Sequence, residues 1–138
     1  MLNFHNRAHV LQPYMLSVLR IMSSLLLLQH GTAKIFGFPH VDYFDNLEIF
    51  SLVGIAGMIE IVGGILLLIG FLTRPTAFIL SGELAFAYFL GHASQGFFPI
   101  LNGGELAVLY TFIFLYLAVA GSGKWGVDYV VHSKSNNP

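Results

Sequence analysis

The chain has 138 residues, enough for one domain, and only 9% of them are charged whereas 56% are apolar. Soluble domains carry about 25% charged residues, so this composition and the mean hydropathy of +0.75 indicate that a lipid bilayer is the solvent. The net charge of −1 argues against a nucleic-acid binder, and the absence of cysteine excludes disulfide scaffolds, thiol redox relays and iron–sulfur clusters.

Four apolar segments of roughly the length of a membrane span succeed one another along the chain. We expect them at about residues 14–36, 49–72, 76–91 and 105–120. The turn Thr73-Arg74-Pro75 between the second and third segments is short enough only for a hairpin, and proline suits the first turn of the next helix. The sequence therefore predicts an all-α fold, a single domain over residues 1–138 that forms an antiparallel bundle of four transmembrane helices.

The distribution of lysine and arginine predicts how this bundle is oriented in the membrane. Cationic residues are enriched in cytoplasmic loops, and a cytoplasmic N-terminus puts five of the six on the inner side and only Lys34 on the outer side. The five are Arg7, Arg20, Arg74, Lys124 and Lys134. We therefore expect a multi-pass protein of the inner (cytoplasmic) membrane with both termini in the cytoplasm and the lipid bilayer as its main partner.

The first span carries a polar stripe. On a helix with 100° per residue, one side of this span collects Ser17, Arg20, Ser23, Ser24, His30, Gly31 and Lys34. Such a stripe is a helix-packing face with serine hydroxyls as interhelical hydrogen-bond donors, or it is the wall of a polar cavity. The sequence leaves both interpretations open.

Two acidic residues lie inside the second and third spans, where charge is costly and needs a reason. A rise of 1.5 Å per residue from the inner face places Arg20 and Glu83 at similar depths, about 9 and 12 Å, and Glu60 deeper, at about 18 Å. This predicts an ion pair between Arg20 and Glu83. Glu60 then lacks a partner, and desolvation favours its uncharged form. Arg20, Glu60 and Glu83 are therefore either structural groups, or they form a site with His30 that handles protons or binds the head group of a ligand.

Small residues share the helix face of Glu60 and predict close contact with a neighbouring helix. They are Gly57, Gly63 and Gly64. Because Gly70 lies nearer the inner end, we expect its replacement to matter less than that of Gly64.

The outer mouth of the bundle collects His30, Lys34, His92 and Glu105. Asn102 and Glu105 have the spacing of a capping box, in which Asn102 caps the fourth span. The alternative is a metal site formed by the two histidines and Glu105, but no spacing of the His-x-x-x-His kind supports it, and we expect no metal. At the inner side, Asp128 in a short amphipathic segment is expected to contact Arg74 or Arg20 as a structural clasp.

Ordered motifs along nearly the whole chain resemble the DoxX family of small bacterial and archaeal membrane proteins. They are His30-Gly31-Thr32-Ala33-Lys34-Ile35-Phe36-Gly37, Glu60-Ile61-Val62-Gly63-Gly64, Gly70-Phe71-Leu72-Thr73-Arg74, Gly96-Phe97-Phe98-Pro99, Asn102-Gly103-Gly104-Glu105 and Gly121-Ser122-Gly123-Lys124-Trp125 with Asp128. The resemblance implies a four-helix membrane protein and a link to thiosulfate:quinone oxidation.

These observations favour a membrane subunit or helper of a quinone-linked redox system, with a redox enzyme as its partner, quinone as its ligand and no covalently bound cofactor. Two other functions stay open: a transporter of small solutes or binder of lipid-like ligands, and a purely structural partner of a membrane complex. Exposed glycine faces also leave a homodimer open.

Overall fold

The computed structural model describes residues 4–135, which form helices and no β-strand. The long helices are α1 (Phe4–Phe36), α2 (Leu52–Ile69), α3 (Thr73–Gly91) and α5 (Glu105–Ala120). The short ones are η1 (Asp42–Phe44), η2 (Ala93–Gln95), α4 (Pro99–Asn102) and α6 (Val127–Ser135). The predicted all-α fold is confirmed, although α1 begins about ten residues before the expected span.

Local sequence signals explain where α2 ends and α3 begins. The Ser51 side chain caps α2 by accepting a hydrogen bond from the Gly54 amide at 3.2 Å. Gly70 ends α2 in the left-handed conformation, with φ of +69°, which glycine adopts without steric cost. Pro75 lies in the first turn of α3, where its missing N–H is not needed. The expected hairpin turn is therefore present.

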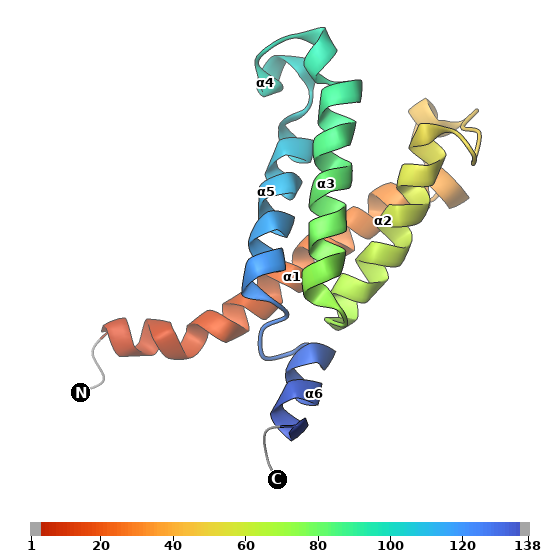
Figure 1. The fold of residues 1–138 in the computed structure, drawn as a ribbon. Helices are drawn as coiled ribbons and strands as arrows, with labels where there is room; N and C mark the ends of the chain where they lie inside the picture. The colour runs from red at the N-terminus through yellow and green to blue at the C-terminus, as the bar shows by residue number, and fades with distance from the viewer. Residues whose placement is uncertain (1–3, 136–138) are drawn as a thin grey trace.

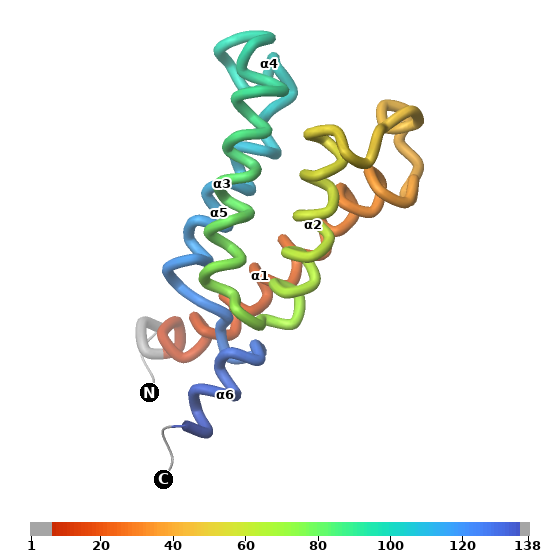
Figure 2. Tube along the Cα trace, turned by 45° about the vertical axis from the view of Figure 1, so that its right-hand side comes forward, coloured from red at the N-terminus to blue at the C-terminus, as the bar shows by residue number. Residues whose placement is uncertain are grey.

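The long helices are arranged as two antiparallel pairs. α1 packs against α2, and α3 packs against α5 along much of their length (Figure 1). The pairs are joined at the turn between α2 and α3, and both views show them diverging away from that turn (Figure 2).

One small apolar core connects the two pairs. All four long helices contribute to it through Leu27, Leu67, Ala77, Leu80, Leu84, Tyr110, Phe114 and Leu117. Many larger apolar side chains point outward instead; for example, Phe78, Phe112 and Val119 are each more than 60% exposed. An apolar exterior around a small core is what a bilayer-facing protein requires, because lipid covers the outward side chains.

Two described helices have the length and hydropathy of a membrane span. They are residues Arg7–Phe36 within α1, with mean hydropathy 1.5, and Leu52–Ile69, with mean hydropathy 2.5. α5 is apolar but has only 16 residues. α3 has 19 residues and includes the buried polar side chains Thr73, Thr76 and Ser81, which lower its hydropathy.

The segment after α5 folds back onto α1. The Lys124 amide donates to the Pro13 carbonyl at 3.1 Å, and the Trp125 amide donates to Ser17 Oγ at 3.0 Å. The Trp125 ring meets Tyr14 edge to face, with centroids 5.8 Å apart. The Asp128 amide donates to the Gly70 carbonyl at 2.9 Å, which places α6 beside the turn between α2 and α3, at the lower end of the molecule in Figure 1.

Candidate functional site

The centre of the site is a buried ion pair between α1 and α2. Lys34 Nζ lies 2.7 Å from Glu60 Oε1, and the two side chains are 13% and 2% exposed. Gly57 makes this approach possible, because a Cβ at that position would lie 2.9 Å from Lys34 Cβ. The expectation that Glu60 lacks a partner is therefore wrong, and Lys34 points into the interior from the C-terminal part of α1 instead of lining an open mouth.

Three carboxylate oxygens around this pair lack hydrogen-bond donors. Glu60 Oε2 and both oxygens of Glu83 are buried, and none has a partner among the described residues. Glu83, on α3, lies within electrostatic range of both Glu60 and Lys34. A buried acceptor without a donor costs free energy, so its persistence points to a function or to a ligand that supplies the donor.

Two further side chains extend the cluster across to α5. The rings of His30 and Tyr110 meet edge to face with centroids 6.3 Å apart, which connects α1 to α5. His30 lies within electrostatic range of Lys34, and Tyr110 within that of Glu60. We call His30, Lys34, Glu60, Glu83 and Tyr110 the central polar cluster. Tyr110 was missed from the sequence, where a tyrosine in an apolar span carries no distinguishing signal.

Arg20 lies elsewhere and serves a structural role. Its side chain is fully buried, and it donates to the carbonyls of Ser122 at 2.9 Å, Leu68 at 2.6 Å and Trp125 at 3.1 Å, and also to that of Leu67. The predicted ion pair between Arg20 and Glu83 is therefore wrong. The last carbonyls of a helix have no N–H partner inside the helix and attract a cation. At the end of α2 the guanidinium of Arg20 provides both the donors and the positive charge.

The packing around Arg20 also changes the expectation for the glycines of α2. A Cβ on Gly70 would lie 2.6 Å from Gly126 Cα and 3.0 Å from Arg20 Cζ, in addition to the strain of its positive φ. A Cβ on Gly64 would lie 2.8 Å from the Leu28 side chain and at an ordinary contact distance of 3.7 Å from the Ser24 carbonyl oxygen. Gly63 is similar, because its Cβ would contact the Leu80 side chain. The geometry thus makes Gly70 the more restrictive position, contrary to the sequence-based expectation.

Asp128 clasps the turn between α2 and α3. Its carboxylate accepts hydrogen bonds from the amides of Leu72 and Thr73, each at 2.8 Å. The expected contacts with Arg74 or Arg20 are replaced by these backbone contacts, because the first amides of α3 need acceptors.

The loop between α3 and α5 is held together by Asn102. The buried Asn102 side chain donates to the Gly96 carbonyl and accepts from the Gly104 amide, both at 2.8 Å, while the Asn102 carbonyl contacts His92 Nδ1 at 3.0 Å. The N-cap of α5 is Gly104, so the predicted capping box is not formed, and Glu105 is exposed at the helix start. His92 and Glu105 thus belong to the loop, not to the central polar cluster.

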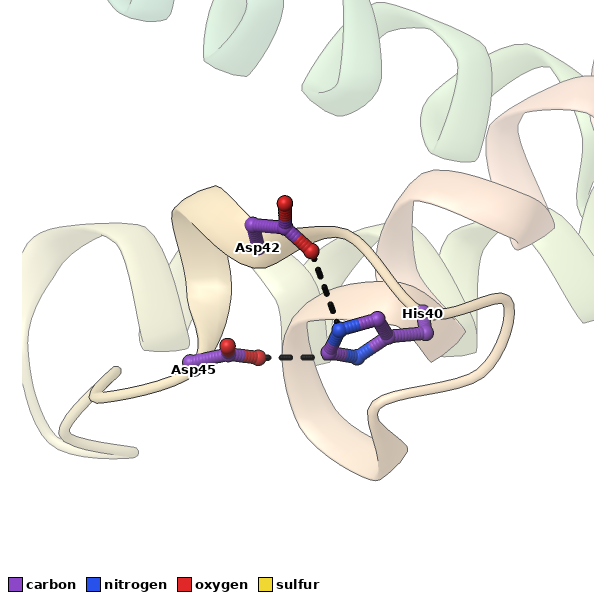
Figure 3. Close-up of side chains that lie close together, drawn as sticks. All are labelled: His40, Asp42 and Asp45. Carbon is purple, nitrogen blue, oxygen red and sulfur yellow. Dashed lines mark ion pairs between the residues drawn. The ribbon is translucent and has the colours of Figure 1, made fainter.

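Another polar group lies on the exposed loop between α1 and α2. His40 lies between two carboxylates, with Nε2 3.0 Å from Asp42 and Nδ1 3.5 Å from Asp45 (Figure 3). Among the described residues, it is the one group of three histidine or acidic side chains close enough to share a metal ion. The two carboxylates already engage both ring nitrogens of His40, and all three side chains are exposed, so we assign no metal here. The side chains of His30, His92 and Glu105, which the sequence offered as an alternative metal site, do not come together in the structure.

Comparisons with known proteins identify relatives of this chain. An uncharacterized protein of Haemophilus influenzae is 46% identical over 127 residues, covering 89% of this chain and 95% of the relative. The inner membrane protein YqjF of Escherichia coli is 29% identical over 126 residues, covering 85% and 92%. No solved structure matches the chain. The DoxX family pattern matches residues 15–93, which include the buried pair and Glu83. With its apolar exterior and two span-length helices, the chain belongs to the DoxX family of membrane proteins.

Proposed function

We propose that this chain is an inner-membrane subunit of a quinone-linked redox system, in which the central polar cluster binds the head group of a quinone or quinol. In this proposal α3 and α5 cross the bilayer beside α1 and α2, and both termini are cytoplasmic. The name of the Escherichia coli relative supports the inner membrane.

The observation that carries the proposal is the set of buried oxygens without donors on Glu60 and Glu83. A quinol presents two hydroxyl donors, which match carboxylate acceptors, and a quinone presents two carbonyl acceptors, which match the ammonium group of Lys34. Lys34 uses one of its three N–H donors on Glu60, so donors remain for a second acceptor. The same three side chains therefore complement both redox forms of the ligand.

The cluster is also suited to move protons. Glu83 carries two free oxygens, so it can accept a proton from a hydroxyl placed beside it, while Lys34 offsets the charge of Glu60. A bound quinone would supply the two-electron chemistry. The chain has no cysteine and hence no thiol or iron–sulfur route for electrons, so we place the electron donor or acceptor on a partner enzyme.

The test is to purify the protein from native membranes and identify co-purifying quinone by mass spectrometry. Short-chain quinone and quinol analogues are then titrated while the melting temperature is followed. A ligand at 100 times its Kd stabilises the folded state by about 2.7 kcal/mol. We expect the wild-type protein to retain quinone and to be stabilised, and Glu83→Gln and Lys34→Gln to lose both effects.

Glu105→Gln is the matched control, because it makes the same change at an exposed carboxylate outside the cluster. It should bind like the wild-type protein. The proposal fails if the wild-type protein neither carries quinone nor responds to the analogues, or if Glu83→Gln binds as well as Glu105→Gln. Stabilisation by small polar solutes instead would support a transporter and would also overturn it.

A further inference from the structure

A second site lies at the opposite end of the molecule from the exposed loop of His40. A cavity of about 460 Å³ opens where the N-terminal half of α1, the start of α3, the end of α5 and α6 come together. Figure 1 shows α6 beneath the lower ends of α3 and α5, with α1 running past them. The cavity does not include any residue of the central polar cluster, so binding at this second site does not depend on the proposed function.

The side chains that line this cavity are rich in cationic groups. The cavity is lined by Arg74, Lys124 and His132. Of the seven acidic residues of the chain, only Asp128 lines it. Both oxygens of Asp128 are already engaged by backbone amides. None of the ion pairs among the described residues involves Arg74 or Lys124. The two cations Arg74 and Lys124 therefore outnumber the single carboxylate of Asp128, and the cavity has an excess of positive charge.

Three donor groups line this cavity without a carboxylate partner among the described ion pairs. The guanidinium of Arg74 donates through Nη1 to the Val119 carbonyl, and its Nε and Nη2 edge passes beside Gly121, another lining residue. Lys124 Nζ lies over the rings of Tyr14 and Tyr129, 5.8 and 5.2 Å from their centroids.

The third donor is the hydroxyl of Thr73. Thr73 lines the cavity and is fully buried, yet Thr73 Oγ1 has no hydrogen-bond partner among the described residues. A buried hydroxyl normally bonds to a neighbouring group, so an unpaired one at the wall of a cationic cavity points to a ligand that accepts its hydrogen bond.

We propose that this cavity binds the phosphate group of an anionic membrane phospholipid. Phosphate offers only acceptors, and the free edge of a guanidinium matches it in a bidentate manner. The remaining wall is apolar, with Pro13, Leu16 and Leu72, which suits the glycerol and upper acyl region better than a free ion. Trp125, 56% exposed at the same end, is typical of a side chain at the membrane interface.

The experiment measures lipid binding to the full-length protein in detergent by native mass spectrometry and by melting temperature. The probes are phosphatidylglycerol, phosphatidylcholine and inorganic phosphate, each titrated separately. We expect phosphatidylglycerol to bind at least about tenfold more tightly than phosphatidylcholine, because only the first carries a net negative charge. Inorganic phosphate at millimolar concentration should neither stabilise the protein nor displace the lipid.

Two cavity variants and one control variant test whether the phospholipid binds in this cavity. Arg74→Gln and Lys124→Gln should each weaken phosphatidylglycerol binding about tenfold, roughly the loss of one charge-assisted hydrogen bond, and the second leaves the contact between Arg74 and Val119 intact. Lys134→Gln removes the same charge from an exposed position on α6 outside the cavity and should bind like the wild-type protein. Equal affinity of Lys124→Gln and Lys134→Gln overturns the proposal, as does equal binding of the two lipids. Stabilisation by inorganic phosphate without lipid binding overturns the assignment to a phospholipid.

Discussion

The ion pair between Lys34 and Glu60 makes a quantitative prediction about stability. Lys34→Met keeps the length of the side chain but removes the donor at 2.7 Å, so both oxygens of the 2% exposed Glu60 are left without a partner. Breaking a buried pair from one side typically costs ~3–5 kcal/mol, because an uncompensated charge stays buried. At a few degrees per kcal/mol for a chain of this size, the melting temperature should fall by ~10–20 °C.

The double change Lys34→Met with Glu60→Met separates this effect from simple loss of packing. Replacing a whole buried pair by apolar side chains is often close to neutral, so the double variant should be more stable than Lys34→Met alone. We expect a coupling energy of ~2 kcal/mol or more in the double-mutant cycle, measured by thermal melting in detergent with circular dichroism.

The cycle formed by Arg20→Met and Glu83→Gln is the comparison, since these residues are not paired in the structure. Their effects should add to within ~0.5 kcal/mol. Additive effects for Lys34 and Glu60, or strong coupling between Arg20 and Glu83, would refute the placement of the ion pair.

Substitutions at three further positions, Arg20, Gly70 and Asp128, test the packing around the turn between α2 and α3. Arg20→Met should lower the melting temperature strongly because four carbonyls lose the hydrogen bond from the guanidinium, and Arg20→Lys should restore only part of the loss because an ammonium cannot reproduce the planar fork. Gly70→Ala should cost ~1–3 kcal/mol by overpacking and strain, whereas Gly82→Ala, whose Cβ would meet nothing within 4 Å, should be neutral or slightly stabilising in the same melting assay. Asp128→Asn should cost ~1–2 kcal/mol, because the asparagine side chain has only one acceptor oxygen for the two backbone N–H groups at the start of α3. An unchanged melting temperature would contradict a stabilising role of the Asp128 carboxylate.

Much of the helical structure could be predicted because it depends on local properties of the chain. The apolar segment at residues 105–120 coincides with α5, since Gly104 and Gly121 flank a run that is apolar except for Glu105 and Thr111. The polar stripe of the first span was also accessible, because the 3.6-residue period alone determines which side chains share a helix face. In the structure Ser17, Ser23 and Ser24 are all buried along that face.

The pairing of the charged side chains could not be predicted from depth along the spans. Counting 1.5 Å per residue assumes helices that stand parallel to one another, and the two helix pairs diverge instead (Figures 1 and 2). Lys34 pairs with Glu60 inside the α1 and α2 pair, and Arg20 donates to carbonyls at the end of α2 instead of reaching Glu83 on α3. Tyr110 joins the site only because α5 lies near α1 at that level.

The sequence by itself determined that this is an apolar, all-helical chain with charged groups inside its helices, because composition and periodicity depend on residues close together in the chain. Only the tertiary structure decided which charges meet, because ion pairs and hydrogen bonds depend on distances of a few ångströms between segments far apart in sequence. A net charge of −1 likewise contained no sign of a cationic cavity. That cavity exists because folding brings Arg74, Lys124 and His132 together while backbone amides engage the one acidic residue beside them.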